Sequence, residues 1–183
     1  MENYAVIDIG SNTIRLCVYA VDGRDFRLLT KKRSMAGLAS YVDKGGNLKD
    51  DGIKKLLNAL KSFRFIYEPY NAKVLVFATA SLRFVKNQKE VKKHILRELG
   101  LEVEIISGKD EAAYSFAGAM YCISTEEGLM VDIGGASTEL VYFKGRKIIK
   151  SYSFPLGSLT CYEKYISRII PTRLEQEKIK RGE

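Results

Sequence analysis

Two short segments of the chain carry the same arrangement of an acidic residue, a glycine and small polar residues. The first runs from Asp8 to Thr13 (DIGSNT) and the second from Asp132 to Thr138 (DIGGAST). Glycines let a backbone approach a phosphate closely and aim its N–H groups at the oxygens. Serine and threonine hydroxyls in both segments add further donors. The pair of segments therefore predicts a site that handles phosphate groups.

The carboxylates of Asp8 and Asp132 need a different explanation, because like charges repel and carboxylates do not bind phosphate directly. Oxygen ligands of this kind suit a hydrated Mg²⁺ ion that bridges to phosphate. A single Asp-x-Gly is common and usually marks a turn. Two of them at matching places in a repeat favour a functional interpretation over turn chemistry alone. We therefore expect both aspartates to be metal ligands.

Each segment opens a repeat of three strand-like runs. An apolar run precedes the aspartate, a second follows the small residues, and a turn pair leads to a third. Turn pairs between β-rich runs are signals of hairpins. Each copy is therefore predicted to begin as a three-stranded antiparallel meander. The second runs are Ile14–Val21 and Leu140–Phe143, and the third runs are Phe26–Thr30 and Lys147–Phe154.

After the first meander the hydrophobic spacing changes from that of strands to that of alternating helices and strands. Helices are predicted at Asp51–Ile66, at Gln88–Leu99 and from Ser107 to about Cys122, and strands at Lys73–Ala78 and Glu102–Ile106. Gly100 serves as a C-cap for the second helix. The order β-β-β-α-β-α-β-α is the plan of an α/β, ribonuclease-H-like domain.

The second repeat is not finished. Its meander is followed by one helix-like segment, Gly157–Ser167, and by another that starts at Pro171 and stops at Glu183. In this plan the first strand of each sheet lies inside, so Leu129–Ile133 would lack its inner neighbour. An apolar strand with one unpaired side invites aggregation. The chain is therefore expected to be a fragment, or to have this edge covered by another copy or chain, unless its last helix folds over the gap.

The composition of the 183-residue chain excludes several classes of protein. It contains no run of 18 apolar residues, and its N-terminus lacks the basic start and apolar stretch of a signal peptide. The cysteines, Cys17, Cys122 and Cys161, lie too far apart in sequence for a zinc motif. They are predicted to be buried free thiols of a cytoplasmic protein.

The formal net charge of +8 favours anionic partners, although a soluble basic surface would account for it equally well. Basic runs occur at Lys31–Arg33 and between Lys86 and Lys93. They could form a track for a long polyanion, but solvated faces are the favoured interpretation.

Four motifs, in their order and spacing, closely resemble those of the exopolyphosphatase / guanosine pentaphosphate phosphatase (Ppx/GppA) family. They are Asp8–Thr13, Ala78–Arg83 (ATASLR), Ile105–Ala112 (IISGKDEA) and Val131–Leu140 (VDIGGASTEL). The resemblance runs from about Ala5 to Leu159. The family belongs to the actin / Hsp70 / sugar kinase superfamily. The resemblance implies an actin/Hsp70-type first domain at residues 1–124, followed by a truncated second copy at residues 125–183.

Members of this family remove terminal phosphate from polyphosphate or guanosine pentaphosphate with Mg²⁺. The resemblance implies that this chain is such a phosphohydrolase, with one of those substrates as its partner, no specific nucleic-acid partner and no membrane. A non-catalytic polyphosphate- or nucleotide-binding module and a kinase of the same superfamily stay open as alternatives. Because the second repeat is unfinished, we expect weak or no turnover from this chain alone. A homodimer or a missing C-terminal portion would complete it.

The resemblance assigns catalytic roles to two residues. Glu111 matches the family's catalytic glutamate, which orients or deprotonates the attacking water; from the sequence alone it could equally be an acidic residue in the first turn of a helix. Arg83 matches a phosphate-binding position, and its alternative is a surface arginine. We place Arg83 near a helix start, where a bound phosphate would offset its conflict with the helix dipole.

The resemblance also assigns the two loops and the metal ligands. Gly10, Ser11, Asn12 and Thr13 match the first phosphate loop, and Gly134, Gly135 and Ser137 match the second. Glu139 joins Asp8 and Asp132 near Mg²⁺, with a cross-strand salt bridge as its alternative. One position departs from the family pattern: Ala136 stands where a third glycine is usual, which would strain the loop if that position needs a positive φ.

Overall fold

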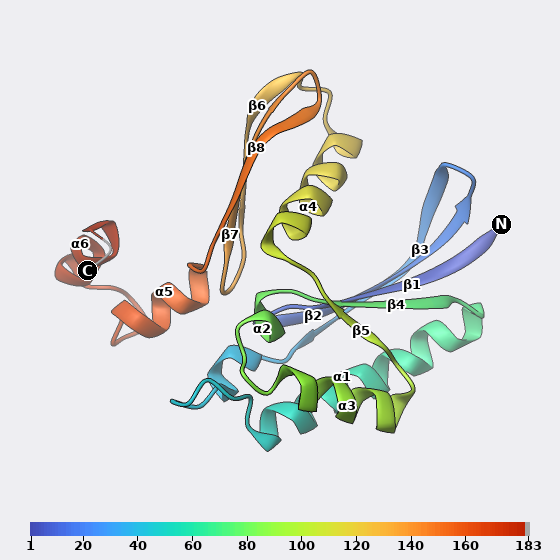
Figure 1. The fold of residues 1–183 in the computed structure, drawn as a ribbon, viewed down its shortest axis with the longest axis horizontal. Helices are drawn as coiled ribbons and strands as arrows, with labels where there is room; N and C mark the ends of the chain where they lie inside the picture. Colours follow the sequence, from blue (N-terminus) through green and yellow to red (C-terminus); the bar gives the residue numbers. More distant parts are fainter. Residues whose placement is uncertain (182–183) are drawn as a thin grey trace. The chain divides into compact units, whose positions relative to one another are not determined.

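The computed structural model describes residues 1–181, which form two compact units divided between Ser107 and Gly108. Each unit has its own sheet (Figure 1). Helix α4, residues Gly108–Cys122, packs on the second sheet. The division into domains 1–124 and 125–183 stays a prediction. No helix among the described residues is long and apolar enough to cross a membrane.

The first unit contains a mixed five-stranded sheet in the order β3-β2-β1-β4-β5. Its strands are β1 (Glu2–Ile9), β2 (Thr13–Asp22), β3 (Asp25–Met35), β4 (Lys73–Ala78) and β5 (Val103–Ile105). The first three form the predicted antiparallel meander, and β4 and β5 continue the sheet in parallel. Strand β1 therefore lies inside, between β2 and β4, as the sequence indicates.

The helices of the first unit follow the predicted spacing. They are η1 (Leu38–Tyr41), α1 (Asp50–Tyr67), η2 (Glu68–Tyr70), α2 (Ala80–Arg83) and α3 (Gln88–Leu99). Acidic side chains in the first turn of α1 complement its dipole. Gly100 ends α3 in the left-handed conformation, with φ 67°, as predicted for a C-cap.

The core of the first unit lies between α1, α3 and one face of the sheet. Ala5, Ile7 and Ile9 alternate along β1 and are all 0% exposed. From α1, Leu60 and Phe63 pack into the same cluster and are also 0% exposed. Strand alternation against a helical stripe therefore builds this core.

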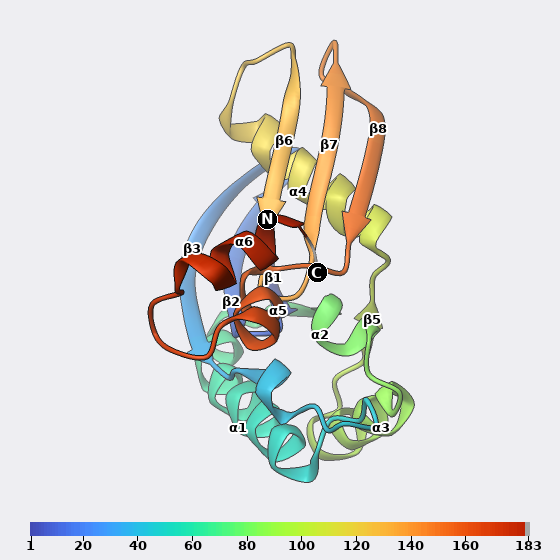
Figure 2. The same ribbon diagram turned by 90° about the vertical axis from the view of Figure 1, so that its left-hand side faces the viewer.

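The second unit contains α4, the antiparallel sheet β6-β7-β8 and two short helices. Their bounds are β6 (Glu127–Ile133), β7 (Thr138–Lys144), β8 (Lys147–Phe154), α5 (Ser158–Tyr165) and α6 (Arg173–Arg181). Figure 2 shows α4 lying along one side of the three strands. Its Phe116 meets Phe143 of β7, with ring centroids 5.1 Å apart. The α/β class and the second, shorter meander are thus confirmed.

One part of the cysteine prediction is wrong. All three cysteines are free, but none is buried: Cys17 and Cys161 are half-buried, and Cys122 is exposed. It is the last residue of α4, where the helix has passed the end of the small hydrophobic cluster beneath it.

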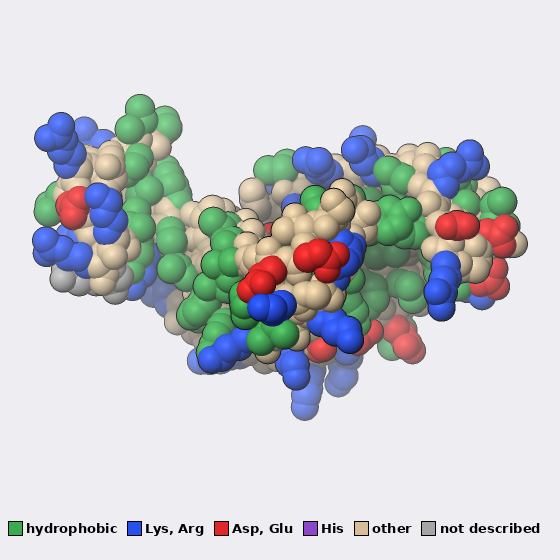
Figure 3. Space-filling view, turned by 90° about the horizontal axis from the view of Figure 1, so that it is seen from above, with side chains coloured by type: hydrophobic (Ala, Val, Ile, Leu, Met, Phe, Trp, Pro, Cys, Tyr) green, Lys and Arg blue, Asp and Glu red, His purple; other side chains and the backbone are tan. Residues whose placement is uncertain are grey.

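Near the end of the described chain, Glu175 holds the segment between α5 and α6. Its carboxylate accepts hydrogen bonds from the backbone N–H groups of Ser167 and Thr172, at 2.9 and 2.7 Å, and from both hydroxyls. These bonds lower the pKa of Glu175 from 4.5 to about 2. Lys and Arg side chains gather around α6 (Figure 3).

Acid is expected to loosen this segment. Because the folded pKa of Glu175 is depressed, its contribution is complete above the ordinary value of 4.5 and is lost as the pH falls toward about 2. An NMR titration should show the amide signals of Ser167 and Thr172 moving with a midpoint near the lower value. Glu175→Gln should abolish that transition. A midpoint at the ordinary glutamate pKa would contradict the hydrogen-bonded arrangement.

Candidate functional site

The first predicted loop is a tight turn between β1 and β2. The N–H of Gly10 donates to the carbonyl oxygen of Thr13 at 3.2 Å. A Cβ atom on Gly10 would lie 2.7 Å from that oxygen, closer than real Cβ atoms approach. The turn therefore requires glycine, and it fixes where Asp8 lies, two residues earlier on β1.

The residues inside this turn are held by the segment that follows β3. The carbonyl of Asn12 accepts a hydrogen bond from the N–H of Gly37 at 2.8 Å, and that of Ser11 accepts one from Ala39 at 3.1 Å. Ser11 is buried at 6% exposure. Gly37 adopts φ 57°, which glycine takes without strain. The first loop is therefore fixed by its own turn bond and by the segment that follows β3.

The second predicted loop repeats this geometry. The N–H of Gly134 donates to the carbonyl oxygen of Ser137 at 2.9 Å, and a Cβ on Gly134 would lie 3.2 Å from the same oxygen. The carbonyl of Gly135 accepts from the N–H groups of Leu159 and Thr160, at 2.8 and 3.1 Å. The start of α5 therefore holds the second loop as the start of η1 holds the first.

The repeat extends further than the sequence patterns suggested. Ser40 donates its hydroxyl to the carbonyl of Gly37 at 2.8 Å, and Thr160 donates its hydroxyl to the carbonyl of Gly157 at 3.1 Å. The signal was present as a Gly-x-x-Ser/Thr spacing after each third strand, and sequence reasoning missed it. A Cβ on Gly157 would lie 2.5 Å from backbone atoms of the second loop.

Ala136 causes no backbone strain. Among the described residues, the positive-φ positions other than glycine are Asn71 and Arg146, so Ala136 lies outside the left-handed region. Gly10 and Gly134 are likewise absent from the positive-φ glycines. Close approach to a carbonyl oxygen explains Gly10 and, more weakly, Gly134, and alanine fits at the position where the family pattern has a third glycine.

Two of the predicted metal ligands lie side by side in the second unit. Asp132 on β6 and Glu139 on β7 are cross-strand neighbours. The neighbour of Glu139 on the other side is Ser153, whose hydroxyl donates to its carboxylate at 2.8 Å. Glu139 is 1% exposed, and neither neighbouring strand places a basic residue opposite it. The salt-bridge alternative for Glu139 is therefore not supported.

Like charges placed directly opposite on a sheet are destabilising. Asp132 and Glu139 supply the carboxylate oxygens that Mg²⁺ prefers, so a cation bound here would relieve their repulsion. No group of three or more His, Cys, Asp or Glu side chains converges within residues 1–181. The two carboxylates fit a Mg²⁺ ion chemically, and the three-carboxylate set with Asp8 stays a prediction.

Helix α4 carries the predicted base and is tied to this carboxylate pair. Ser115 donates its hydroxyl to Asp132 at 2.7 Å. Glu111 lies four residues before Ser115, on the same face of α4. The hydrogen bond therefore aligns the face that bears Glu111 with the end of β6 that bears Asp132.

Arg83 belongs to the first unit and its predicted position was wrong. It is the last residue of α2, a four-residue helix, so the argument from a helix start does not apply. Its guanidinium donates to the carbonyl of Ile106 at 3.1 Å and lies over the ring of Phe84. The same segment is bonded to the end of β1, since Ser81 donates to the carbonyl of Ile9. Arg83 is thus anchored next to the first loop.

The structure therefore gathers the predicted residues into two sets, each within its own unit. The first unit holds Asp8, Gly10, Ser11, Asn12, Thr13 and Arg83, and the second holds Glu111, Asp132, Gly134, Gly135, Ser137 and Glu139. Their assembly into one site stays a prediction.

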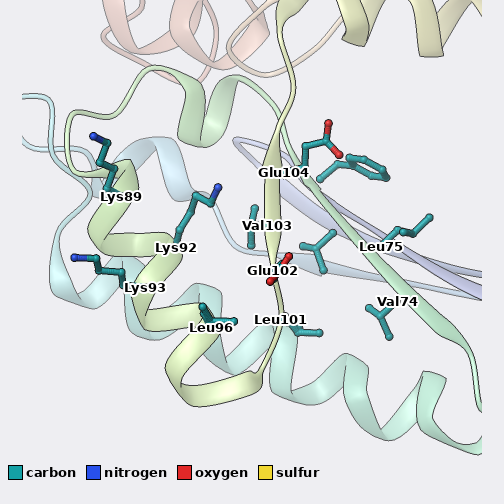
Figure 4. A pocket seen from close by; sticks show the side chains of 12 residues that line it. Val74, Leu75, Lys89, Lys92, Lys93, Leu96, Leu101, Glu102, Val103 and Glu104 are labelled. Atoms are coloured by element: carbon teal, nitrogen blue, oxygen red, sulfur yellow. The ribbon is translucent and has the colours of Figure 1, made fainter.

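A groove of about 750 Å³ in the first unit lies apart from these residues. It runs between α3 and the edge of the sheet at β4 and β5 (Figure 4). Lys89, Lys92 and Lys93 line it together with Glu102 and Glu104. Because acidic side chains accompany the basic ones, this groove does not favour a polyanion track.

Comparison with known proteins places these features in a family. Residues 17–182 match the model of the Ppx/GppA phosphatase family. A solved Ppx/GppA family member from Aquifex aeolicus is 30% identical, with a TM-score of 0.79 over 97% of this chain and 58% of its own. An exopolyphosphatase from Cytophaga hutchinsonii is similar in fold, with 24% identity and a TM-score of 0.89 over 96% of this chain and 57% of its own.

A more distant fold likeness is to the ethanolamine utilization protein EutJ from Carboxydothermus hydrogenoformans, at 19% identity and a TM-score of 0.51. The chain spans less than two thirds of the length of these relatives, from 57% to 65%.

Gly157→Ala is expected to distort the second loop. The added Cβ has no room against the backbone of Gly135 and Ala136, so the free energy of unfolding of this unit should fall by about 1–3 kcal/mol. Thermal unfolding with NMR of the loop amides would measure this. Gly118→Ala on α4 is the matched control, since nothing lies within 4 Å of its Cβ position. Equal effects of the two changes would contradict the packing described.

Ser153→Ala is expected to destabilise the second unit through Glu139. It removes a hydrogen-bond donor from a carboxylate that is 1% exposed, which should cost about 1–3 kcal/mol. Urea denaturation would measure the loss. Ser151→Ala, two residues earlier on the same face of β8, is the control and should change stability by less than half as much.

Proposed function

Because the chain belongs to the Ppx/GppA phosphatase family, we propose that it is a phosphohydrolase that releases terminal phosphate from inorganic polyphosphate or guanosine pentaphosphate. The observation that carries the proposal is the pair of equivalent glycine turns, each placed two residues after an aspartate at the end of a strand. One such turn would be ordinary turn chemistry. Two, with matching anchors behind them, suit the binding of phosphate groups by both loops.

In each loop, one glycine shapes the turn and the residues after it bind phosphate. Gly10 and Gly134 use their N–H groups to close the turns, so their contribution is to shape them. Binding then falls to the polar groups that follow, Ser11, Asn12 and Thr13 in the first loop and Gly135 and Ser137 in the second. Backbone N–H and hydroxyl donors held in fixed positions suit phosphate oxygens.

The acidic residues in both units would hold Mg²⁺. Asp132 and Glu139 offer adjacent carboxylates, and Asp8 offers the third predicted ligand. When bound, Mg²⁺ would bridge to phosphate oxygens and neutralise their charge. Ser115 and Ser153 orient two of the carboxylates through the hydrogen bonds described above.

The reaction itself would rest on Glu111 and Arg83. Glu111 would position and deprotonate the attacking water for in-line displacement. Arg83, fixed by its bond to Ile106, would offset the negative charge that develops on the transferred phosphate. These two roles follow the family resemblance. The hydrogen bonds from Arg83 to Ile106 and from Ser115 of α4 to Asp132 support them.

Glu111→Gln is expected to lower Mg²⁺-dependent phosphate release by about 10²–10⁴-fold relative to the parent chain, with polyphosphate and guanosine pentaphosphate tested side by side. The carboxamide keeps the size of the side chain and removes the base. Asp110→Asn, one residue earlier on α4, is the matched control and should retain most of the activity. Chelation of Mg²⁺ should abolish release by the parent and the control alike.

Calorimetric measurement of triphosphate binding distinguishes the proposed phosphohydrolase from a non-catalytic binding module. A phosphohydrolase shows release that depends on Glu111, whereas a binding module shows equal affinity for parent and Glu111→Gln with no release from either. The incomplete second repeat leads us to expect slow turnover by this chain alone. Turnover that is unchanged in Glu111→Gln would contradict the assigned role.

A further inference from the structure

Strand β5 is an outer strand of the first sheet, and the groove described above runs along it. It pairs with β4 over Val103–Ile105, and within residues 1–181 no strand pairs with its other side. Its partners on β4 are Val76–Ala78, so in the same part of the chain the first half of β4, Lys73–Leu75, is paired only with β1. An outer strand presents backbone N–H and C=O groups to which a further chain can bond.

The direction of these backbone groups follows from one hydrogen bond. The N–H of Ile106 donates to the carbonyl oxygen of Ala78 on β4 at 3.1 Å. Because the backbone groups of successive strand residues point to opposite sides, those of Val103 and Ile105 point away from β4. The outer edge of β5 therefore offers the N–H and C=O groups of both residues to an added strand.

The walls of the groove carry opposite charges. Lys89, Lys92 and Lys93 of α3 line one side, while Glu102 and Glu104 line the other. Figure 4 shows Lys89 and Lys92 on one side of β5 and Glu104 on the other. Within residues 1–181, no ion pair involves any of these five side chains. Both sets of charges are therefore available to a bound partner.

One end of the groove is apolar. The chain turns back at Gly100, so the last turns of α3 lie beside the start of β5. Leu96 lines the groove there together with Leu101 and is 49% exposed. Leu75 of β4 adds a further side chain that is 42% exposed. The lysines lie toward the other end of α3, so the groove passes from apolar to charged along its length.

A second copy of this chain does not suit the edge. Antiparallel pairing of two β5 strands keeps the same faces of both sheets on the same side. Such a pairing would bring lysines toward lysines and place glutamates beside glutamates. Like charges directly opposite each other destabilise a strand pair. The charges of the two walls therefore favour an occupant with the opposite order of charges.

We propose that the outer edge of β5 is a strand-addition site for an extended peptide in which acidic and basic residues alternate. Its acidic side chains lie against the lysines of α3, its basic side chains lie beside Glu102 and Glu104, and an apolar residue lies at the Leu96 end. Backbone hydrogen bonds to Val103 and Ile105 supply affinity, and the alternation of side chains supplies specificity. This inference goes beyond the proposed phosphohydrolase activity and does not depend on it.

Short length and charge are also the means by which proteins keep edge strands from unspecific pairing. On β5 the two signs of charge are separated by face, so one alternation is attracted and a peptide without it is repelled at part of its length. The edge therefore discriminates between strands rather than excluding all of them.

The test uses the 183-residue chain and two synthetic probes, Leu-Lys-Glu-Lys-Glu and its reverse sequence, because an added strand can run in either direction. Both probes are capped at their ends and carry a fluorophore. The control is Leu-Lys-Lys-Glu-Glu, which has the same composition and net charge without the alternation. Fluorescence anisotropy should show one of the two probes binding at least about tenfold more tightly than the control.

Methylation of the peptide backbone distinguishes strand addition from charge attraction alone. Methyl groups on the nitrogens of alternate residues remove the N–H donors from one edge of the bound probe. One alternate set should abolish binding and the other should leave it intact, since only one edge of the probe faces β5. At a probe concentration about ten times its Kd, hydrogen exchange at the amides of Val103 and Ile105 should slow by about tenfold. Exchange on β1 should not change.

Variants of the chain locate the binding site. Lys92→Glu reverses a charge on the α3 wall and should weaken binding of the probe at least about tenfold. Lys147→Glu makes the same change of net charge at an exposed position on β8 and should leave binding unchanged. If Lys92→Glu does not fold, Lys89→Glu serves in its place.

Four results would overturn the proposal. They are no binding of either probe, equal binding of the control peptide, tolerance of both sets of backbone methyl groups, and self-association of the chain that protects the β5 amides without any peptide.

Discussion

The hydrogen bond from a strand-end glycine to the carbonyl three residues later is the interaction on which both halves of the candidate site depend. It turns the chain sharply between β1 and β2 and again between β6 and β7. A single bond of this kind contributes only about 1 kcal/mol net. Its importance is steric, since a Cβ on Gly10 would meet Thr13 at 2.7 Å. Any wider turn would move the preceding aspartate away from the polar residues that follow.

A second layer keeps these turns in place. The glycines after the third strands, Gly37 and Gly157, bring backbone donors to the loop carbonyls, and each is steadied by a hydroxyl three residues later. On the second sheet, Ser115 and Ser153 hold carboxylates that repel one another as cross-strand neighbours. The pairing of Asp132 with Glu139 places like charges opposite each other, against the usual preference of cross-strand pairs. Such violations are expected at functional sites. The serines keep the pair ordered despite its repulsion.

The parts that the sequence made predictable are those with strong periodicity. The two meanders, α1, α3 and the inner position of β1 follow from alternation, helical spacing and a C-terminal glycine. Arg83 was misplaced because α2 is a single turn, too short for any periodic signal. The anchors at Gly37 and Gly157 were missed because their partners are backbone carbonyls far away in sequence. Whether Ala136 needed a positive φ depended on the fold of the loop, which composition does not determine.

Strand β6 carries a predicted metal ligand on one face and exposed apolar side chains on the other. Its side chains alternate, so Asp132 points to the α4 face, where Ser115 binds it, while Val131 and Ile133, 50% and 66% exposed, point to the opposite face. Within residues 1–181, β6 pairs with β7 alone, whereas β1 pairs with a strand on each side. A strand with an uncovered face and one pairing neighbour opens locally more easily than an inner strand. Because Asp132 lies on this strand, local opening of β6 would also displace its carboxylate.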